Sequence, residues 1–322
     1  DSKSAGEGKV FFLRREEFER RIRILRDQGD ASAISPELRG WNNSRPPVKP
    51  IGRHLLSVSE LASRYCPTMR DIYLRRVARI QPPPNFKTFR GLVYHFIINQ
   101  LTVRSKRHIF ERGKIAGPEL FELLLEEEPV AIESAVRDAY ARVQISEDEV
   151  RSLTPIASKL YRFLALQVAA SVDLTHSRFP HADVDSLVNE SIPAVSEMKV
   201  DGSLVGLSRE LSVDIYTPYN TVIDVKTGDV RSFHRYVGAG YALAIESDKG
   251  VEVNFGITLY ISVQPSAPAP EVKADYYVIG DELRREFLEL RDEAQLLIER
   301  GKDPGMPVRC PEFCPYYTIC NG

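Results

Sequence analysis

The cysteines constrain the fold of this chain more than any other feature, because they are few and widely separated. Three of them close the sequence, in RCPEFCPYYTICNG, and the fourth stands far upstream, in SRYCPTMRDIYLRR. They are Cys66, Cys310, Cys314 and Cys320. Four thiolates can hold either zinc or an iron–sulfur cluster, and the residues alone leave both open. A shared site would staple the two ends of the fold together.

Composition indicates an ordinary globular protein. The 322 residues are 43% hydrophobic and 27% charged, which suffices for one large domain or two modest ones. No apolar run is long enough to cross a bilayer, and the N-terminal DSKSAGEGK resembles a flexible leader rather than a secretion signal. We therefore expect a cytoplasmic protein without a membrane partner, in which cysteines do not form a disulfide framework.

Basic residues are concentrated locally, although the net charge is only −2. Residues 64–79 carry five arginines against one acid, and residues 104–114 form a second basic run. The segment 119–149 is strongly acidic instead. Such segregation has two interpretations, a track for nucleic acid or ordinary solvated helix faces.

The first half of the chain has mainly helical patterns. A serine N-cap at Ser57 or Ser59 begins one helix, which Pro67 interrupts before it resumes. Apolar residues recur at helical spacing in two longer segments. The predicted helices cover residues 13–26, 57–80 with the break, 89–110 and 149–176.

Strand patterns begin after about residue 180. We expect two strands around the Asp201-Gly202 turn, a second pair joined at TPYN (217–220), and a buried strand over 253–263. Helices are predicted over 231–247 and 280–301, the latter ending at Gly301. This order indicates an α/β protein. Its predicted parts are a helical N-terminal region (1–180), an α/β core (181–300) and a C-terminal cysteine segment (301–322).

The strongest chemical signal is the strand pair around TPYN, which carries Asp214 and the run Asp224-Val225-Lys226. Residues two apart on a strand face the same side, so Asp224 and Lys226 project together, and pairing brings Asp214 near. Two close carboxylates repel unless a cation lies between them, and Mg²⁺ or Mn²⁺ suits oxygen ligands. Lys226 would then orient a metal-bound water for attack on a phosphate. The alternative is a surface salt bridge on an edge strand.

Other residues can complete such a site. His95 ends GLVYH, four residues after Gly91 on a predicted helix, and is either a third metal ligand or a structural histidine. Tyr241 lies on the helix after the Asp224 strand and either contacts a phosphate or base or packs in the core. An extra carboxylate ligand is open among Glu190, Glu197 and Glu210.

Taken in order, these motifs resemble the RecB-type branch of the PD-(D/E)xK nucleases. The matching pieces are SVSELASRYCP, GLVYH, VD, IDVKTG, GYALAIE and the cysteine cluster. The four-cysteine arrangement resembles the CRISPR-associated RecB-like iron–sulfur nucleases of the Cas-four type. The segments GWNNSRPPVKP and SRYCPTMRDIYLRRV look most like the archaeal subtype I-A variant of those proteins.

The resemblance implies a restriction-endonuclease-like sheet flanked by helices, with a C-terminal iron–sulfur segment. It also implies a Mg²⁺- or Mn²⁺-dependent deoxyribonuclease, typically an exonuclease on single-stranded DNA, that trims new spacer DNA beside the CRISPR integrase proteins. The implied catalytic residues are His95, Asp214, Asp224, Lys226 and Tyr241. The implied metal set is His95, Asp214, Asp224 and Val225, and a [4Fe–4S] cluster is implied on Cys66, Cys310, Cys314 and Cys320.

Two positions depart from the family pattern. Val237 stands four residues before Tyr241, where the branch usually has a glutamine, and the terminal spacing is C-x3-C-x5-C instead of a C-x2-C start. The first departure supports a second hypothesis, a DNA-binding adaptor of the integrase complex with weak or no nuclease activity. A third hypothesis is an iron–sulfur exonuclease of general repair.

Overall fold

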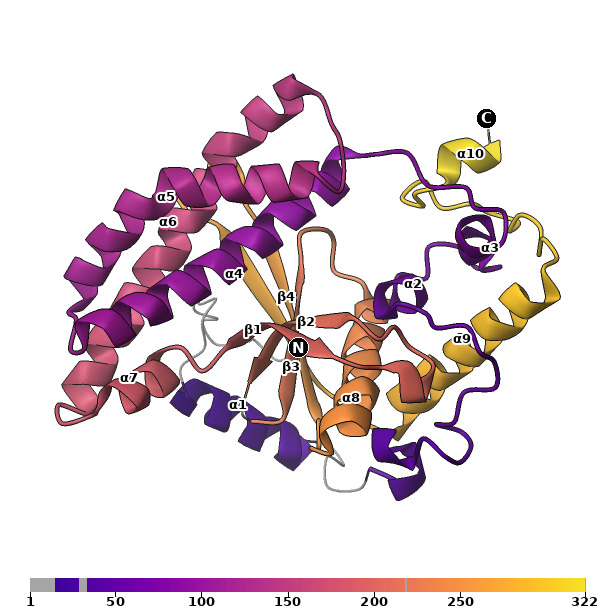
Figure 1. The fold of residues 1–322 in the computed structure, drawn as a ribbon, viewed down its shortest axis with the longest axis horizontal. Coiled ribbons are helices and arrows are strands. Elements are labelled where there is room, and N and C mark those ends of the chain that lie inside the picture. Colours follow the sequence, from indigo (N-terminus) through magenta and orange to yellow (C-terminus); the bar gives the residue numbers. More distant parts are fainter. Residues whose placement is uncertain (1–14, 29–33, 218, 322) are drawn as a thin grey trace.

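A computed structural model describes residues 15–28, 34–217 and 219–321, and the predicted N-terminal leader lies outside them. The described chain forms a five-stranded sheet in the order β1-β2-β3-β4-β5, with helices against both faces (Figure 1). Neighbouring strands are antiparallel except β3 and β4, which are parallel and are joined through helix α8. This arrangement confirms the predicted mixed α/β class.

The strands are β1 (Val195–Val200), β2 (Leu211–Thr217), β3 (Thr221–Lys226), β4 (Phe255–Ser262) and β5 (Glu271–Val278). The helices before the sheet are α1 (Arg15–Gln28), α2 (Val58–Ala62), α3 (Arg70–Arg76), α4 (Phe86–Arg112), α5 (Gly117–Tyr140), α6 (Glu147–Arg178) and α7 (Val184–Ser191). Those within and after it are α8 (Arg235–Lys249), α9 (Asp281–Arg300) and α10 (Tyr317–Asn321).

Two apolar cores cover the two faces of β3. Ile223 and Val225 belong to a core shared with α4, α5 and α6, whereas Val222 belongs to one shared with α2, α8 and α9. The side chains of a strand alternate between faces, so this division follows directly from the apolar run of β3. The same alternation turns Asp224 toward the second core.

Several sequence signals are confirmed at the residues that carry them. Ser57 caps α2 in a reciprocal capping box with Glu60, and a break separates α2 from α3. The TPYN segment joins β2 to β3. Helix α9 ends at Gly301, which has a φ of +62° in the left-handed region. Each of these signals acts through local backbone bonds, so the surrounding fold does not override it.

The strand predicted after the Asp201-Gly202 turn is wrong. Residues Ser203–Val205 form a short 3-10 helix, closed by bonds from the Leu207 amide to the Gly202 carbonyl (2.9 Å) and from the Gly202 amide to the Ser208 carbonyl (3.0 Å). Strand β1 therefore pairs with β2 instead. Helices α5 and α7 and strand β5 were not predicted.

The segment from residue 34 to α3 lies on α8 and α9, away from the long helices α4 to α6 (Figure 1). Gly40 allows this packing, because a Cβ there would lie 2.0 Å from the Leu243 carbonyl oxygen of α8. Within the described ranges, no helix has the length and apolar character needed to cross a membrane.

Candidate metal and nucleic-acid site

Asp214 and the Asp224 strand come together as the sequence predicts. Ile215 pairs with Ile223, and one step further along, Asp214 Oδ2 accepts a hydrogen bond from the Val225 amide at 2.9 Å. In a regular ladder, the Val225 amide would donate to a backbone carbonyl of β2. Here it donates to the Asp214 carboxylate, and this bond holds the carboxylate against β3. Val225 has an aliphatic side chain, so its backbone carbonyl is the only group that it can offer to a metal, and the residue is only 1% exposed.

Asp224 is a buried carboxylate with only half of its hydrogen-bonding capacity used. Its Oδ1 accepts from Lys226 Nζ at 2.7 Å, while Oδ2 is buried with no hydrogen-bond partner. Burial and the charge of Asp214 raise the pKa of Asp224 to about 6, although Lys226 lowers it. A buried carboxylate oxygen without a donor is costly, so a cation would be favourable there.

Lys226 acts as a cation in this arrangement. Burial alone would lower its pKa, but the charges of Asp224 and Asp214 outweigh burial and raise the pKa above its ordinary value. Lys226 is therefore an ammonium at neutral pH, able to donate hydrogen bonds to a phosphate or a water. It is 28% exposed and thus within reach of a ligand.

A compact set of metal-ligand atoms forms beside this pair. His95 on α4, Glu197 on β1 and Asp214 on β2 have ligand atoms within 4.8 Å of one another, and His95 Nδ1 lies 3.5 Å from Asp214 Oδ1. Asp224 is not one of these three, and its Oδ1 is bound by Lys226. One imidazole and two carboxylates form a donor set that suits Mn²⁺ or Mg²⁺.

Glu197 is the carboxylate that the sequence could not select. It has a φ of +52° within β1, a left-handed conformation that is uncommon for a residue other than glycine. Its Oε2 accepts a hydrogen bond from the Ser212 hydroxyl. Backbone strain of this kind is concentrated at functional sites. Glu210, by contrast, is exposed just before β2, and Glu190 lies in α7.

Tyr241 lies next to the carboxylates, with its hydroxyl engaged. Its OH donates to the Ser212 carbonyl at 2.9 Å. Burial, together with the charges of Asp214, Asp224 and Glu197, raises its pKa well above 10. Tyr241 is thus a neutral phenol that ties α8 to β2. Val237, one turn earlier, packs in the α8 core with 5% exposure.

Gly91 is not required for a close approach of α4. A Cβ there would lie 3.6 Å from Thr227 Oγ1, an ordinary van der Waals contact. The approach is held instead by Arg90, whose Nη2 donates to the Thr227 carbonyl at 3.0 Å. This contact brings the N-terminal part of α4, and with it His95, over the end of β3.

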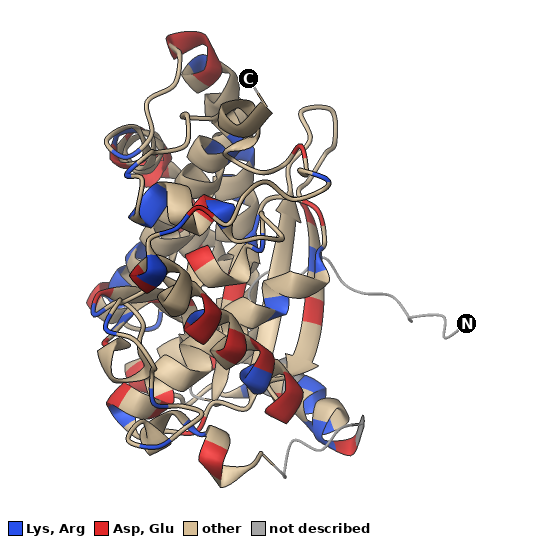
Figure 2. Cartoon of the chain, turned by 90° about the vertical axis from the view of Figure 1, so that its right-hand side faces the viewer, with Lys and Arg blue, Asp and Glu red and all other residues tan. Residues whose placement is uncertain are grey.

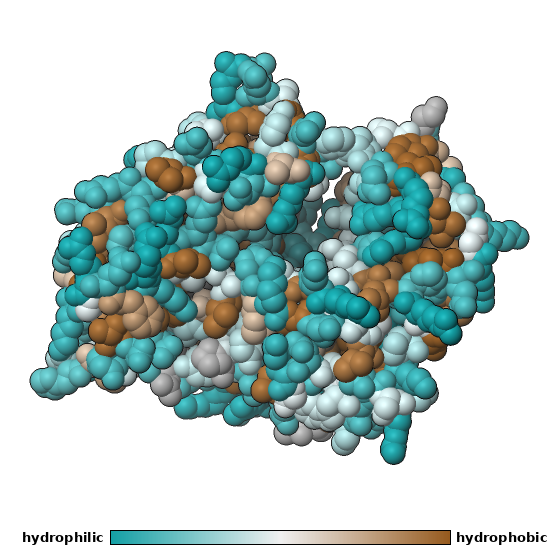
Figure 3. Space-filling model, viewed as in Figure 1, coloured by the Kyte–Doolittle hydropathy of each residue, from teal (hydrophilic) through white to brown (hydrophobic). Residues whose placement is uncertain are grey.

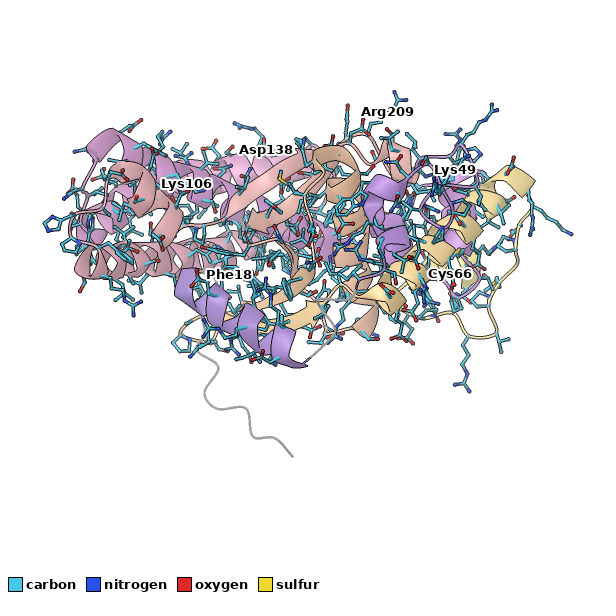
Figure 4. The ribbon with its side chains drawn as sticks, turned by 90° about the horizontal axis from the view of Figure 1, so that it is seen from below. Phe18, Lys49, Cys66, Lys106, Asp138 and Arg209 are labelled. Carbon is cyan, nitrogen blue, oxygen red and sulfur yellow. The ribbon has the colours of Figure 1, made fainter. Side chains whose placement is uncertain are left out.

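The two cysteine-bearing segments lie side by side at the end of the molecule that carries α3 and α10, where Figure 4 labels Cys66. Thr68 Oγ1 donates to the Gly305 carbonyl at 2.9 Å, and Tyr316 OH donates to the Ile80 carbonyl at 3.1 Å. Arg70 makes a forked pair with Asp303, with Nη2 to Oδ2 at 2.9 Å. These contacts hold the segment around Cys66 against the C-terminal segment that carries the other three cysteines.

The thiol environment suits a cation-bound thiolate better than a free one. Cys314 is 5% exposed, and burial, with a smaller contribution from negative charge on Asp71, Cys310 and Cys66, raises the pKa of its thiol to about 11. Neighbouring thiols of this kind deprotonate when they bind metal. Arg70 also donates from Nη1 to Cys320 Sγ at 3.2 Å, a hydrogen bond typical of the surroundings of a metal–sulfur site.

The basic run of residues 64–79 is largely engaged within the protein. Arg76 pairs with Glu60, Arg75 lies 3.8 Å from the same carboxylate, and Arg70 pairs with Asp303. Figure 2 shows basic and acidic ribbon segments intermixed on this side of the molecule. These arginines mainly hold α2, α3 and the C-terminal segment together.

The fold and the site define a mixed α/β protein in which a helix supplies a histidine and the sheet supplies acidic ligands and a lysine, and in which two cysteine-bearing segments lie together. A family model described as CRISPR-associated exonuclease Csa1 matches residues 12–322. The chain belongs to this family. It is 34% identical over 291 residues to the CRISPR-associated exonuclease Csa1 of Saccharolobus solfataricus, covering 89% of this chain and 92% of the relative. It is 30% identical over 294 residues to that of Thermoproteus tenax, covering 91% and 94%.

A first prediction tests whether Glu197, and not Glu190 or Glu210, is the extra carboxylate ligand. Glu197→Gln is expected to weaken Mn²⁺ binding at least about tenfold, because it removes one of two carboxylate charges from the set. Glu210→Gln is the matched control and is expected to leave binding unchanged. Isothermal titration with Mn²⁺ measures both. Equal affinities in the two variants would remove Glu197 from the site.

Proposed function

We propose that this chain is a Mg²⁺- or Mn²⁺-dependent deoxyribonuclease of CRISPR adaptation. It removes nucleotides from the ends of single-stranded DNA and so trims new spacer DNA beside the integrase proteins. The observation that carries the proposal is the cluster of His95, Glu197 and Asp214 next to the buried Asp224–Lys226 pair. The names of the two relatives, which are exonucleases, support the same reaction class.

The residues have separable roles in this proposal. A bound Mg²⁺ or Mn²⁺ would supply Lewis-acid stabilisation of the charge that develops on the phosphate. His95, Glu197 and Asp214 would hold it, with the Val225 amide fixing Asp214. Lys226, kept cationic by Asp224, would donate to the phosphate or to the attacking water.

We also propose a [4Fe–4S] cluster on Cys66, Cys310, Cys314 and Cys320. The contacts between their two segments support a shared site, as does the buried Cys314 thiol. Its role would be structural, holding α3 against the C-terminal segment. Anaerobic purification followed by iron and sulfide assays tests it: about four of each per chain is expected, and one zinc with no sulfide would overturn it.

The adaptor hypothesis depended on Val237. That side chain packs in the α8 core, and the polar site assembles without a contribution from it. We therefore favour the enzyme. Co-purification with integrase proteins is expected, and its absence alongside intact nuclease activity would favour general repair instead.

A digestion experiment tests the proposed reaction. With Mn²⁺, wild-type protein should shorten end-labelled linear single-stranded DNA and leave closed circular single-stranded DNA intact. Asp214→Asn should reduce this rate by about 10²-fold or more, because the ligand set loses a charge. Asp148→Asn, an exposed acid at the start of α6, is the matched control. Equally negligible digestion by wild type and Asp214→Asn would leave the adaptor.

A further inference from the structure

A group of aromatic and guanidinium side chains joins the cysteine-rich end of the chain to the loop after β3. The Cζ atom of Arg231 lies 4.5 Å from the ring centroid of Phe313. In the sequence, Phe313 stands between Cys310 and Cys314. The ring of Tyr65, the residue before Cys66, lies 6.3 Å from that of Phe313 at an interplanar angle of 59°. None of these three residues belongs to either proposed metal site.

The group lies next to Lys226. In the β3–β4 register, Tyr260 is the partner of Lys226. The hydroxyl of Tyr260 is 3.0 Å from His234 Nδ1 and donates to the Arg231 carbonyl at 3.4 Å. The loop of residues 227–234 is thereby fixed over the strand position that carries the lysine.

Two cations, Lys226 and Arg231, lie near His234. Burial and the positive charges of these two residues together lower the pKa of His234 to about 4. The histidine is therefore neutral, and the cations here are the Lys226 ammonium, which is paired with Asp224, and the Arg231 guanidinium. The only acid paired with Arg231 among the described residues is Asp229, at 3.4 Å, and that side chain is 86% exposed. A phosphate would be attracted to this place.

The rings are also accessible. Phe313 is 40% exposed and the Arg231 side chain 36%, although both are held by their mutual contact. Figure 3 shows the surface hollowed between the long helices and the part that carries α2, α3 and α10, where Figure 1 places the loop after β3. An exposed aromatic ring beside a cation is an arrangement suited to a flat ligand that carries negative charge.

We propose that Phe313, Arg231 and Tyr65 form a subsite that stacks an unpaired nucleobase and binds its phosphate next to the point of cleavage. This inference rests on the proposed nuclease function and assigns its preference for single strands to specific residues. Aromatic faces stack bases of any sequence, and guanidinium groups add charge and stacking. Bases inside a duplex have no free face, so the subsite selects single-stranded DNA.

Binding measured without cleavage tests the subsite. In Ca²⁺, fluorescence anisotropy of a labelled oligothymidylate should show about tenfold weaker binding for Phe313→Leu and for Arg231→Gln, and less than a twofold change for duplex DNA. Matched controls are Phe179→Leu, an exposed phenylalanine after α6, and Arg151→Gln, an exposed arginine with an acidic neighbour. Equal weakening of single-stranded and duplex DNA would reduce Arg231 to a general phosphate contact and overturn the stacking proposal.

Abasic nucleotides isolate the stacking itself. In wild type, one abasic position near the end should cost about tenfold in affinity, and the same position should cost nothing further in Phe313→Leu. A scan of wild type with no sensitive position would overturn the subsite, even if a variant failed to fold. The outcomes also separate the two proposals. Binding with this signature but no cleavage in Mn²⁺ would remove the nuclease function alone, whereas cleavage with no signature would remove the subsite alone.

Discussion

Asp224→Asn is expected to lower the rate of metal-dependent DNA cleavage by about 10³-fold or more. The substitution keeps the shape of the side chain and removes its charge. Lys226 then loses the negatively charged partner at 2.7 Å that helps to keep it cationic, and the negative charge next to the metal set is lost. Loss of charge stabilisation at a metal site costs several kcal/mol in the transition state, and each 1.36 kcal/mol is a factor of ten in rate.

Single-turnover digestion of end-labelled single-stranded DNA in Mn²⁺ measures the effect, with Asp148→Asn as the control. The thermal midpoint of the metal-free protein provides a second readout. Burial raises the pKa of Asp224, which shows that its charge is destabilising in the folded protein. Asn should therefore leave the midpoint unchanged or raise it, as at other active sites where stability is lost for function. A variant that keeps its rate, or loses rate and midpoint together, would contradict a catalytic role.

Local signals in the sequence were sufficient for much of this site. The turn at TPYN and the alternation of strand side chains bring Asp214 to β3 and put Asp224 and Lys226 on one side. The GLVYH motif lies on α4, and the packing of this helix puts His95 Nδ1 3.5 Å from Asp214 Oδ1. These inferences succeed because period, turn and cap depend on neighbouring residues.

Glu197 could not be found in this way. Its position depends on which strand pairs with β1, and the Asp201-Gly202 turn suggested the wrong partner. Strand pairing between distant segments is decided by the packing of the whole sheet. The left-handed φ that turns Glu197 toward the site leaves no compositional trace, because glutamate is not a residue that favours this conformation.

The sequence also does not show which arginines are free to bind a ligand. The run of residues 64–79 could be a track for DNA or ordinary solvated helix faces, and in the structure Arg70 and Arg76 are paired with acids of the protein. Arg231 was not singled out, and it lies on the exposed ring of Phe313. Charge density along the chain does not distinguish an internally neutralised cation from one that faces a ligand, since partners are set by tertiary contacts.

Glu246→Ala is expected to destabilise the protein by about 3–5 kcal/mol, the largest stability effect we predict. Glu246 is fully buried in α8, and its Oε1 accepts from Arg39 Nη1 at 2.7 Å and from Arg284 Nη2 at 2.8 Å. Its Oε2 accepts from Arg284 Nη1 at 2.7 Å and from the Gly40 amide at 2.8 Å. Alanine would leave the buried Arg284 guanidinium without an anion and Arg39 with only the exposed Glu252, at 3.7 Å.

Denaturant unfolding of the wild type and of Glu246→Ala measures this loss in the free energy of unfolding. Asp148→Ala is the control, because its pair with Arg151 is exposed, and such surface pairs contribute about 0–1 kcal/mol. The network ties the segment around Arg39 and helix α9 to α8, so its loss should also expose that segment to protease. The double variant Glu246→Leu with Arg284→Met should recover part of the loss, since replacing a buried ion pair by apolar groups removes the unpaired charge. If Glu246→Ala lowers the free energy of unfolding no more than the surface control does, the cost of burying these charges cancels the stability gained from their ion pairs. The segment around Arg39 would then be held on α8 by its apolar contacts alone.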